Sequence, residues 1–424
     1  MSSPPSTPPS TPPSTPPSTP LRIPEYTAFL QLRFFLAMGW HMQALIVQWY
    51  VYTLTHDPFM MGLIGLAEAL PAIGAALPMG GLVDRMDKRK AVRIAGAIIV
   101  TSATATAFLV QESVLPQIGK GSVLTGLFAM IILNGLARAM YSPAMFSMLG
   151  MIVPRELIPK AAAMSSTVWQ AAVIVGPLVG GLMYGLFGVG ITSATYVACM
   201  LVGMGGAWRL STKPAMVVAD RGRIYDELMQ GVRFIISKKV LLGALTLDLF
   251  AVLFGGVTAL LPVYADTILH VDQTGLGVLR ASMSAGSVAM MAWLSVRPPK
   301  HNAGRTLLWS VAAFGVCMLA FSYCEIFWLS VTILVLAGVF DSVSVVIRST
   351  ILQLETPDSM KGRVAAANTM FITSSNEIGA FESGTAARLI GVQPSVVFGG
   401  VMTLLVVAVV AYTMPSLRRL KLGA

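Results

Sequence analysis

The chain has 424 residues, of which 55% are hydrophobic and only 11% are charged, and its mean hydropathy is +0.74. This composition excludes an ordinary soluble domain and is typical of a protein that crosses a membrane many times. The formal net charge of +10 suits either nucleic-acid binding or basic loops on one side of a membrane, and the positions of the charges decide between them.

Residues 1–24 form the first predicted segment, a tail in which Ser, Thr and Pro repeat up to Pro20. Tracts of this kind favour extended, solvated conformations and bury no core. The tail lacks the basic start and apolar stretch of a secretory signal. We expect a disordered extension, with a docking role as the alternative.

Twelve apolar runs of about 20 residues follow the tail, each long enough to cross a bilayer as a helix. Because the bilayer core offers no water to backbone polar groups, each run must satisfy them internally, which predicts an all-α fold. The runs cover residues 28–54, 60–82, 91–111, 122–147, 161–187, 190–210, 241–265, 274–296, 305–323, 326–350, 365–388 and 393–414.

The runs divide into two predicted six-helix bundles, at residues 25–210 and 241–415, followed by a basic tail at 416–424. A polar linker at 211–240 joins the bundles. An apolar stripe at helical spacing runs through it, formed by Ile224, Leu228, Val232 and Ile235. This pattern predicts an amphipathic helix on the cytoplasmic surface of the membrane.

Lys and Arg are unevenly distributed among the loops. With the N-terminus in the cytoplasm, 24 of the 29 Lys and Arg residues fall on the cytoplasmic side, 2 fall outside and 3 fall within predicted helices. Because basic loops remain on the cytoplasmic side, both termini and the linker are predicted to be cytoplasmic. The basic excess therefore reflects membrane orientation, and we expect no nucleic-acid partner.

Polar and aromatic side chains in the first span make it a candidate wall of a substrate cavity. Gln43 and Gln48 lie near the predicted midplane, where an amide can hydrogen-bond a substrate. Trp49 is placed either to stack on an aromatic substrate or to anchor the helix at the membrane interface. Trp169 and Gln170 in the fifth span are expected to contribute similarly.

The segment from Gly80 to Lys90 carries six charges between two apolar runs. Gly80 and Gly81 allow two helix backbones to approach closely. The basic turn that follows predicts a short cytoplasmic loop, which is either a latch between two helices or an ordinary orientation loop. We interpret Lys88 and Lys90 as orientation charges.

Small residues recur in the fifth span, at Gly176, Pro177, Gly180 and Gly181. A Gly–Pro pair bends a helix, and adjacent glycines permit close packing against a neighbouring helix. This motif predicts a tight contact, which either seals the transport path or serves packing alone.

An internal repeat relates the two halves. A shift of 203 residues superimposes Gly135 on Gly338, Pro154 on Pro357, Lys160 on Arg363, Gly176 on Gly379 and Gly181 on Gly384. Two parallel six-helix repeats with a central linker are a transporter architecture, in which the substrate site lies near the midplane between the halves.

The segment Gly80–Lys90 resembles the signature loop of the major facilitator superfamily, with its Gly-x-Leu-x-Asp-Arg core followed by basic residues. It departs from the family at Asp87, where a second glycine is usual, and the second half has no recognisable copy of the loop. The motif Gly176–Gly181 is similar to the one that marks the exporter and antiporter branches. Residues 65–71 and 374–379 resemble the subgroup of bacterial enterobactin exporters and related drug exporters.

This resemblance implies an alternating-access transporter in the cytoplasmic (inner) membrane of a bacterium. It places Asp84 at the cytoplasmic start of the eleventh helix, near Arg363, where it locks the halves while the cavity faces outward. An anion at a helix N-terminus is favoured by about 0.3–1 kcal/mol. Arg85 and Arg89 would hold Asp84 or meet lipid headgroups.

Ionisable residues inside membrane helices are costly and mark functional sites. The resemblance implies that the first, fourth, seventh and tenth helices line the cavity, and the repeat matches Arg138 of the fourth with Asp341 of the tenth. We expect these two residues to form an ion pair across the halves. The pair is either disrupted by substrate or a proton during transport, or it is purely structural.

Three more acids, Asp248, Glu68 and Glu377, are candidates for proton coupling. Glu68 and Glu377 lie on helices that are expected to meet between the halves, where they either share a proton or form a structural network. Arg280 and Arg348 lie near helix ends, and we expect both to snorkel towards the headgroups.

These features predict a secondary active transporter, specifically a proton-coupled exporter of amphiphilic small molecules of the siderophore or drug type. The alternatives are an importer of a small metabolite and a non-transporting receptor of the same fold. The chain is not predicted to be an enzyme, because it has no phosphate-cradling glycine loop and no His-Glu-x-x-His helix.

The three cysteines, Cys199, Cys317 and Cys324, lack metal-ligand spacing and imply neither a metal site nor a disulfide framework. We expect no metal and no cofactor. The expected partners are a small-molecule substrate, protons as the coupling ion and the lipid bilayer, and the chain is expected to be a monomer.

Overall fold

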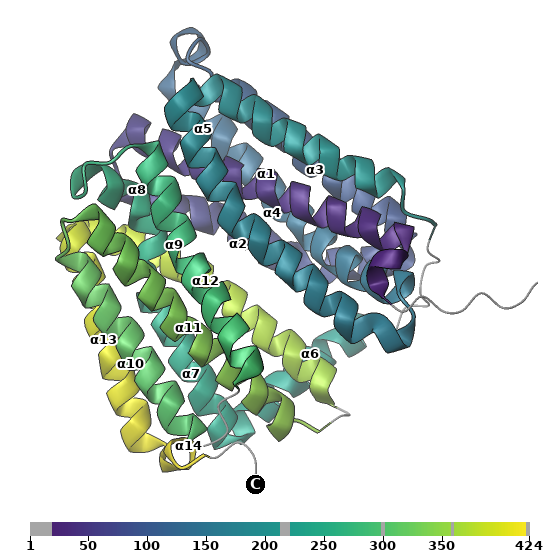
Figure 1. The fold of residues 1–424 in the computed structure, drawn as a ribbon, viewed down its shortest axis with the longest axis vertical. Helices are drawn as coiled ribbons and strands as arrows, with labels where there is room; N and C mark the ends of the chain where they lie inside the picture. The colour runs from purple at the N-terminus through teal and green to yellow at the C-terminus, as the bar shows by residue number, and fades with distance from the viewer. Residues whose placement is uncertain (1–18, 213–220, 298–301, 358–359, 421–424) are drawn as a thin grey trace, which may run out of the picture.

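The computed structural model describes residues 19–212, 221–297, 302–357 and 360–420 (Figure 1). In these ranges the chain is almost entirely helical and contains no strand, which suits a backbone surrounded by lipid. Residues 1–18 of the Pro-rich tail and 421–424 of the basic tail lie outside the described residues.

The first half contains α1 (Pro24–Thr55), α2 (Pro58–Arg85), α3 (Lys88–Leu109), α4 (Leu115–Ile152) and α5 (Ile158–Trp208), with short 3-10 helices at Pro20–Arg22 and Arg155–Leu157. The fifth and sixth predicted spans both lie in α5. Gly188 separates them with φ of 75° and ψ of 177°, a backbone conformation that glycine adopts without a steric penalty. The chain therefore crosses the membrane six times in this half.

The second half follows α6 (Arg221–Ser237) of the linker. It contains α7 (Lys239–Phe254), α8 (Val257–Thr267), α9 (Gln273–Val296), α10 (Ala303–Ser322), α11 (Phe327–Glu355), α12 (Lys361–Ile390), α13 (Val392–Thr413) and α14 (Pro415–Arg418). The seventh predicted span is divided between α7 and α8, because the helix is interrupted at Gly255 and Gly256.

All twelve predicted runs lie almost wholly within these helices, which confirms an all-α membrane protein with twelve crossings. Within the described residues, eight helical segments are long and apolar enough to cross a membrane, and one of them, Arg155–Trp208, holds two crossings. The crossings outside this set are α1, α9 and α12, which carry Gln48, Arg280 and Glu377 respectively.

Corresponding glycines bring helices together in the two halves. Gly135 of α4 lies against the backbone carbonyl of Glu68 in α2, and Gly338 of α11 lies against the backbone carbonyl of Met283 in α9. A side chain at either glycine would collide with that carbonyl. The 203-residue repeat therefore reflects a repeated helix packing, and the two bundles share one architecture.

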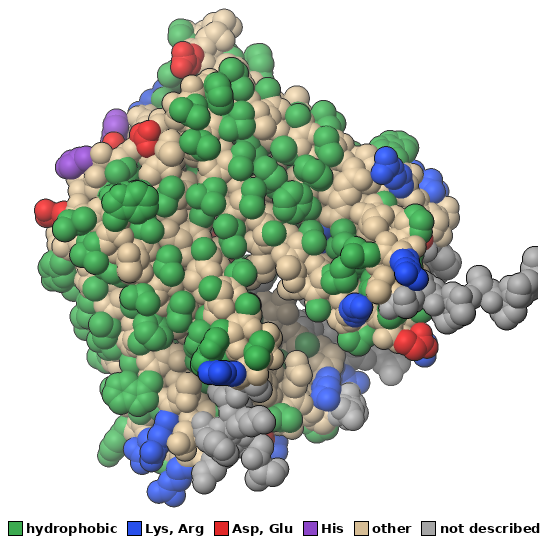
Figure 2. Space-filling view, in the orientation of Figure 1, with side chains coloured by type: hydrophobic (Ala, Val, Ile, Leu, Met, Phe, Trp, Pro, Cys, Tyr) green, Lys and Arg blue, Asp and Glu red, His purple; other side chains and the backbone are tan. Residues whose placement is uncertain are grey.

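Lys and Arg side chains gather at one end of the molecule, which we call the basic end (Figure 2). Helix α1 begins there, α2 ends there and α12 begins there. The two halves lie against each other along two helix pairs, α2 with α12 and α5 with α9. In Figure 1 the first-half and second-half helices point apart towards the basic end.

The contact between α2 and α12 is tight near the opposite end. Gly62 of α2 faces the backbone of Ala380 and Phe381, and Arg388 forms an ion pair with Asp57 at 3.4 Å. Towards the basic end the packing is looser, because a Cβ at Gly74 or Gly80 of α2 would meet no atom within 4 Å. Figure 2 shows a hollow in the surface between the halves.

The Gly80–Lys90 segment is a tight helix-to-helix turn. Helix α2 continues to Arg85, and Asp87 caps α3 by accepting a hydrogen bond from the backbone N–H of Lys90 at 3.0 Å. Asp87 has φ of −57°, a conformation open to any residue, so the departure from the usual glycine costs no strain. Its side chain instead satisfies an unpaired amide of α3.

Lys88, which the sequence suggests is an orientation charge, also has a structural role. Its side chain is fully buried, and its Nζ donates a hydrogen bond to the carbonyl of Val83 at 2.7 Å. The same carbonyl accepts a hydrogen bond from the backbone N–H of Met86 at 3.2 Å, so the lysine adds a second bond at the end of α2. Arg89 likewise donates to the carbonyl of Leu210 at 3.3 Å, which ties the start of α3 to the end of α5.

The linker helix α6 packs on protein at its C-terminal half. Ile235 is buried and Val232 is partly buried against the cluster that contains Val364 of α12. Gly231 approaches the backbone of Arg363 at the start of α12. The expected membrane-facing stripe is therefore covered by α12 and α7 at this point, while the side chains of Ile224 and Leu228 lie outside the described residues.

Replacing Gly277 by Leu is expected to separate the halves at the opposite end. A Cβ at Gly277 of α9 would lie 2.6 Å from the carbonyl oxygen of Pro177 and 3.1 Å from the Cα of Gly181, both in α5. Spin labels are attached to cysteines that replace Ser113 and Glu325, on loops of the two halves at that end, in a protein without its native cysteines. The distance between the two labels reports the separation of the halves. We expect the label distance to lengthen in G277L.

The matched control is Gly74→Leu, because a Cβ at Gly74 meets no atom within 4 Å. The control should keep the wild-type distance distribution. An unchanged distribution in G277L would mean that the crossing of α5 and α9 does not hold the opposite end closed.

Candidate functional site

Three charged side chains from three helices meet between the halves: Glu68 of α2, Arg138 of α4 and Glu377 of α12. Gly135 lies against the carbonyl of Glu68 and so brings α4 close to α2. Arg138 follows three residues later, on the same face of α4. Glu377 reaches the same point from the second half, because α12 packs against α2.

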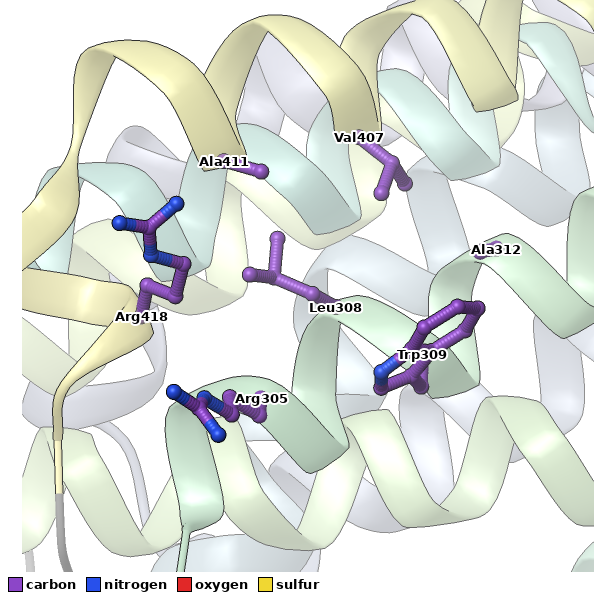
Figure 3. A pocket seen from close by; sticks show the side chains of 7 residues that line it. All are labelled: Arg305, Leu308, Trp309, Ala312, Val407, Ala411 and Arg418. Carbon is purple, nitrogen blue, oxygen red and sulfur yellow. The ribbon is translucent and has the colours of Figure 1, made fainter.

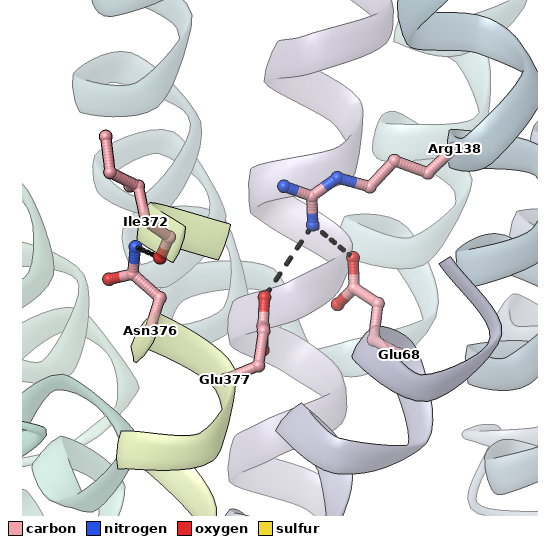
Figure 4. A network of polar contacts seen from close by, with 5 residues as sticks. All are labelled: Glu68, Arg138, Ile372, Asn376 and Glu377. Atoms are coloured by element: carbon pink, nitrogen blue, oxygen red, sulfur yellow. Dashed lines mark hydrogen bonds and ion pairs between the residues drawn. The ribbon is translucent and has the colours of Figure 1, made fainter. Parts of the chain in front are cut away.

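One nitrogen of Arg138 contacts both carboxylates (Figure 4). Its Nη1 lies 3.2 Å from Oε1 of Glu68 and 3.8 Å from Oε1 of Glu377. The side chains of Arg138, Glu68 and Glu377 are 37%, 22% and 19% exposed, so the network is shielded but open to a small solute or water. We call these three residues the charge bridge.

An aromatic ring covers the charge bridge from the first span. The guanidinium carbon of Arg138 lies 5.4 Å from the ring centroid of Trp40, within the range of a cation–π interaction. Beside Glu377, the amide of Asn376 donates to the carbonyl of Ile372 at 2.9 Å (Figure 4). Trp40 was not among the predicted site residues, because a single tryptophan in an apolar run gives no signal of its own.

The predicted ion pair between Arg138 and Asp341 is not formed. Helix α12 rather than α11 packs against α2 beside Arg138, so the acid of α12 lies within reach of its guanidinium. Asp341 is half-buried in α11 and forms no ion pair with the described residues. The expected meeting of Glu68 and Glu377 does occur, with Arg138 between them.

Asp248 of α7 and Arg348 of α11 form a second ion pair, within the second half. Their side chains are only 8% and 7% exposed. The prediction that Arg348 snorkels to the headgroups is therefore wrong, since its guanidinium turns inwards to a carboxylate. Both partners belong to one half, so this pair does not link the halves.

The polar residues of the first span have different surroundings. Gln48 accepts a hydrogen bond from Arg280 of α9, so Arg280 turns towards the first half instead of snorkelling. Gln43 is buried, and its Oε1 has no hydrogen-bond partner among the described residues. Trp49 is buried in a hydrophobic cluster that contains residues of both halves.

The fifth-span residues surround α1. Trp169 packs edge-on against His41 with ring centroids 5.9 Å apart, and the guanidinium carbon of Arg33 lies 5.2 Å from its ring centroid. Gln170 is half-buried. Gly176 and Gly180 both face the backbone of α1, while Gly181 faces α9. The motif thus packs one helix against both halves.

The expected latch can be described only in part. The side chain of Asp84 lies outside the described residues, and Arg85 is exposed. Arg363 is half-buried at the start of α12, where its backbone carbonyl faces Gly231 of α6. A contact between Asp84 and Arg363 therefore stays a prediction. Within the described residues, no cluster of three or more potential metal ligands occurs.

Comparison with known proteins agrees with this architecture. The family model of the Major Facilitator Superfamily matches residues 30–380. The enterobactin exporter EntS of Shigella boydii is 23% identical over 408 residues, which cover 94% of each chain, and that of Escherichia coli has the same identity and coverage.

Solved structures with the same fold include a D-xylose-proton symporter and a POT family transporter in complex with 5-aminolevulinic acid. The symporter matches with a TM-score of 0.70 and 11% identity over 95% of this chain and 99% of that chain. The POT transporter matches with a TM-score of 0.67 and 11% identity, over 92% and 96%. At this identity the likeness shows the fold alone.

Proposed function

Because the chain belongs to the Major Facilitator Superfamily, we propose that it is an alternating-access transporter that exports amphiphilic small molecules in exchange for protons. The observation that carries this proposal is the charge bridge, in which Arg138 of the first half lies between Glu68 of its own half and Glu377 of the other. Arg388 and Asp57 also form an ion pair between the halves, but at the opposite end of the molecule.

An exchanger must not change conformation while it is empty. In the ionised charge bridge, the attraction between Arg138 and Glu377 adds to the packing that holds α12 against the first half. A proton on Glu377 removes its charge, and a bound substrate can replace the arginine as its partner. Either event weakens the link between the halves, so each ligand permits a change that the empty carrier resists.

Competition for one group also explains why the two ligands would move in opposite directions. Glu377 is 19% exposed, so a proton and a polar group of the substrate can reach it but cannot both occupy it. The carrier then crosses with one or the other. Glu68 keeps Arg138 in place in both cases, since it hydrogen-bonds the same Nη1.

The direction and the substrate class are supported by the bacterial relatives, which are named as enterobactin exporters, and by the glycine motif of α5. The ring of Trp40 lies over the charge bridge, and a site that combines charged and aromatic groups favours amphiphilic compounds such as siderophores or drugs. We place the protein in the bacterial inner membrane, with the basic end and both termini in the cytoplasm. The two halves are residues 25–210 and 241–415, joined by 211–240.

A deletion strain of the source bacterium tests this function. Extracts of its cells and medium are compared by untargeted metabolomics with those of strains complemented by the wild type or by R138M, which has a similar shape and no charge. We expect one or more amphiphilic compounds to accumulate inside the deletion and R138M strains. Depletion of such a compound inside these cells would instead identify an importer, and an unchanged profile would favour a receptor.

A further inference from the structure

A pocket of about 440 Å³ lies on the second half (Figure 3), at the edge that faces away from the first half (Figure 1). Helices α10, α13 and α14 bound it at the basic end of the molecule. Two arginines, Arg305 and Arg418, lie at one end of it, and the rest of the lining is apolar. The transport proposal uses none of these residues.

The chain holds the two arginines on opposite sides of the pocket mouth. Gly304 in the first turn of α10 packs against the backbone of Leu417, whose side chain is fully buried. The backbone N–H of Gly304 also donates to the carbonyl of Leu420 at 3.3 Å. This docking of α14 on α10 places Arg418 across from Arg305, as Figure 3 shows.

Among the described residues, the two guanidinium groups have no counter-charge. Both arginines are exposed, and neither forms an ion pair with a described residue. Arg305 lies in the first turn of α10, and Arg418 follows the end of α13. Both therefore lie at the level where the apolar spans end, which is the level of the lipid headgroups.

The remaining lining matches the next layers of a lipid. Trp309 is 75% exposed and stands four residues beyond Arg305, about 6 Å deeper along the helix. Leu308 and Val407 provide an aliphatic wall between α10 and α13. The cationic groups thus lie at the basic end and the apolar groups lie deeper, in the order of the phosphate and the apolar part of a lipid.

We propose that this pocket binds one anionic phospholipid, with its phosphate between Arg305 and Arg418 and an acyl chain along Leu308 and Val407. Two arginines without counter-ions recognise the negative headgroup, and the apolar groove distinguishes a lipid from a free anion. Basic pockets on the cytoplasmic side of membrane proteins bind anionic headgroups in this way.

Native mass spectrometry of the full chain tests the site. Protein in detergent is mixed with phosphatidylglycerol or phosphatidylcholine, and retained lipid is counted for the wild type, for R305Q/R418Q and for R419Q. Arg419 is an exposed neighbour outside the pocket and serves as the control. Each pocket arginine is expected to contribute about fivefold in affinity. The affinity of the double variant for phosphatidylglycerol should therefore fall about 25-fold, while R419Q should keep the wild-type affinity.

Tryptophan fluorescence gives a second readout that needs no arginine variant. Phosphatidylglycerol with brominated acyl chains should quench the wild type more than brominated phosphatidylcholine does, and W309L should lack that difference. Equal retention of both lipids, or equal retention by the wild type and R305Q/R418Q, would overturn the proposal. Displacement of the lipid by soluble glycerol phosphate would also overturn it, because the site would then recognise the anion alone.

Discussion

Replacing Glu377 by Gln is expected to reduce proton-driven efflux strongly while the protein still binds substrate. The amide keeps the size of the side chain but carries no charge and takes up no proton, so the link between Arg138 and α12 no longer depends on protonation. Coupling free energies of 1–3 kcal/mol correspond to roughly 5- to 150-fold effects, and we expect a loss in this range. Efflux from inverted vesicles is measured with and without an imposed pH gradient.

The matched control is Glu382→Gln, on the same helix. Glu382 is half-buried, and its Oε2 accepts a hydrogen bond from the hydroxyl of Ser383 at 3.4 Å. E382Q should keep the dependence of efflux on the pH gradient. If E377Q retains the wild-type dependence on the gradient, Glu377 does not carry the coupling proton. Loss of the gradient dependence in E382Q alone would assign the coupling proton to Glu382 instead of Glu377.

Of the single substitutions discussed, Asp248→Asn is expected to lower the stability of the protein most. Arg348 would remain 7% exposed without a counter-charge, and breaking a buried ion pair from one side costs about 3–5 kcal/mol. The apparent melting temperature of the purified protein in detergent should fall. The double variant D248N/R348M, which removes both charges, should recover most of the loss.

Asp226→Asn serves as the control, since Asp226 is exposed on α6. Its melting temperature should match that of the wild type. A D248N protein as stable as the wild type would show that Arg348 finds another partner or reaches water. A double variant less stable than D248N would show that the arginine stabilises the fold through contacts other than this pair.

The sequence was sufficient to predict the fold because a bilayer imposes a simple rule on composition. Most crossings are long apolar helices, and the more polar α1, α9 and α12 still contain apolar runs, so all twelve could be located from the sequence, including the two within α5 that Gly188 separates. The internal repeat was visible in the sequence because the helix packing that the two halves share requires small residues at equivalent positions. Gly135 and Gly338 must be small where α4 and α11 meet a neighbouring backbone.

The charged contacts were harder to predict. The 203-residue repeat makes Arg138 and Asp341 equivalent positions. The predicted ion pair assumed that equivalent residues meet across the pseudo-twofold axis. The structure instead places Glu377 beside Arg138, because α2 of the first half packs against α12 of the second. Which acid an interior arginine reaches depends on helix crossings, and hydropathy does not report those.

Lysine and arginine near helix ends presented the same difficulty. From the sequence, Lys88 was interpreted as a cytoplasmic orientation charge, and Arg348, near the end of a predicted helix, was expected to snorkel. In the structure Lys88 caps the end of α2 and Arg348 pairs with Asp248. A basic residue one or two turns from a helix end can snorkel, cap a carbonyl or pair with an acid, and the choice depends on neighbours that are distant in the sequence.

Proton movement in proteoliposomes tests the proposed exchange most directly. A pH-sensitive dye is enclosed in vesicles that contain the protein, and enterobactin or an amphiphilic dye such as ethidium is added outside. Exchange predicts that substrate entry drives protons out, so the lumen becomes alkaline in the wild type and not in E377Q. Substrate entry without a change in lumenal pH, or with acidification of the lumen, would contradict proton exchange at the charge bridge.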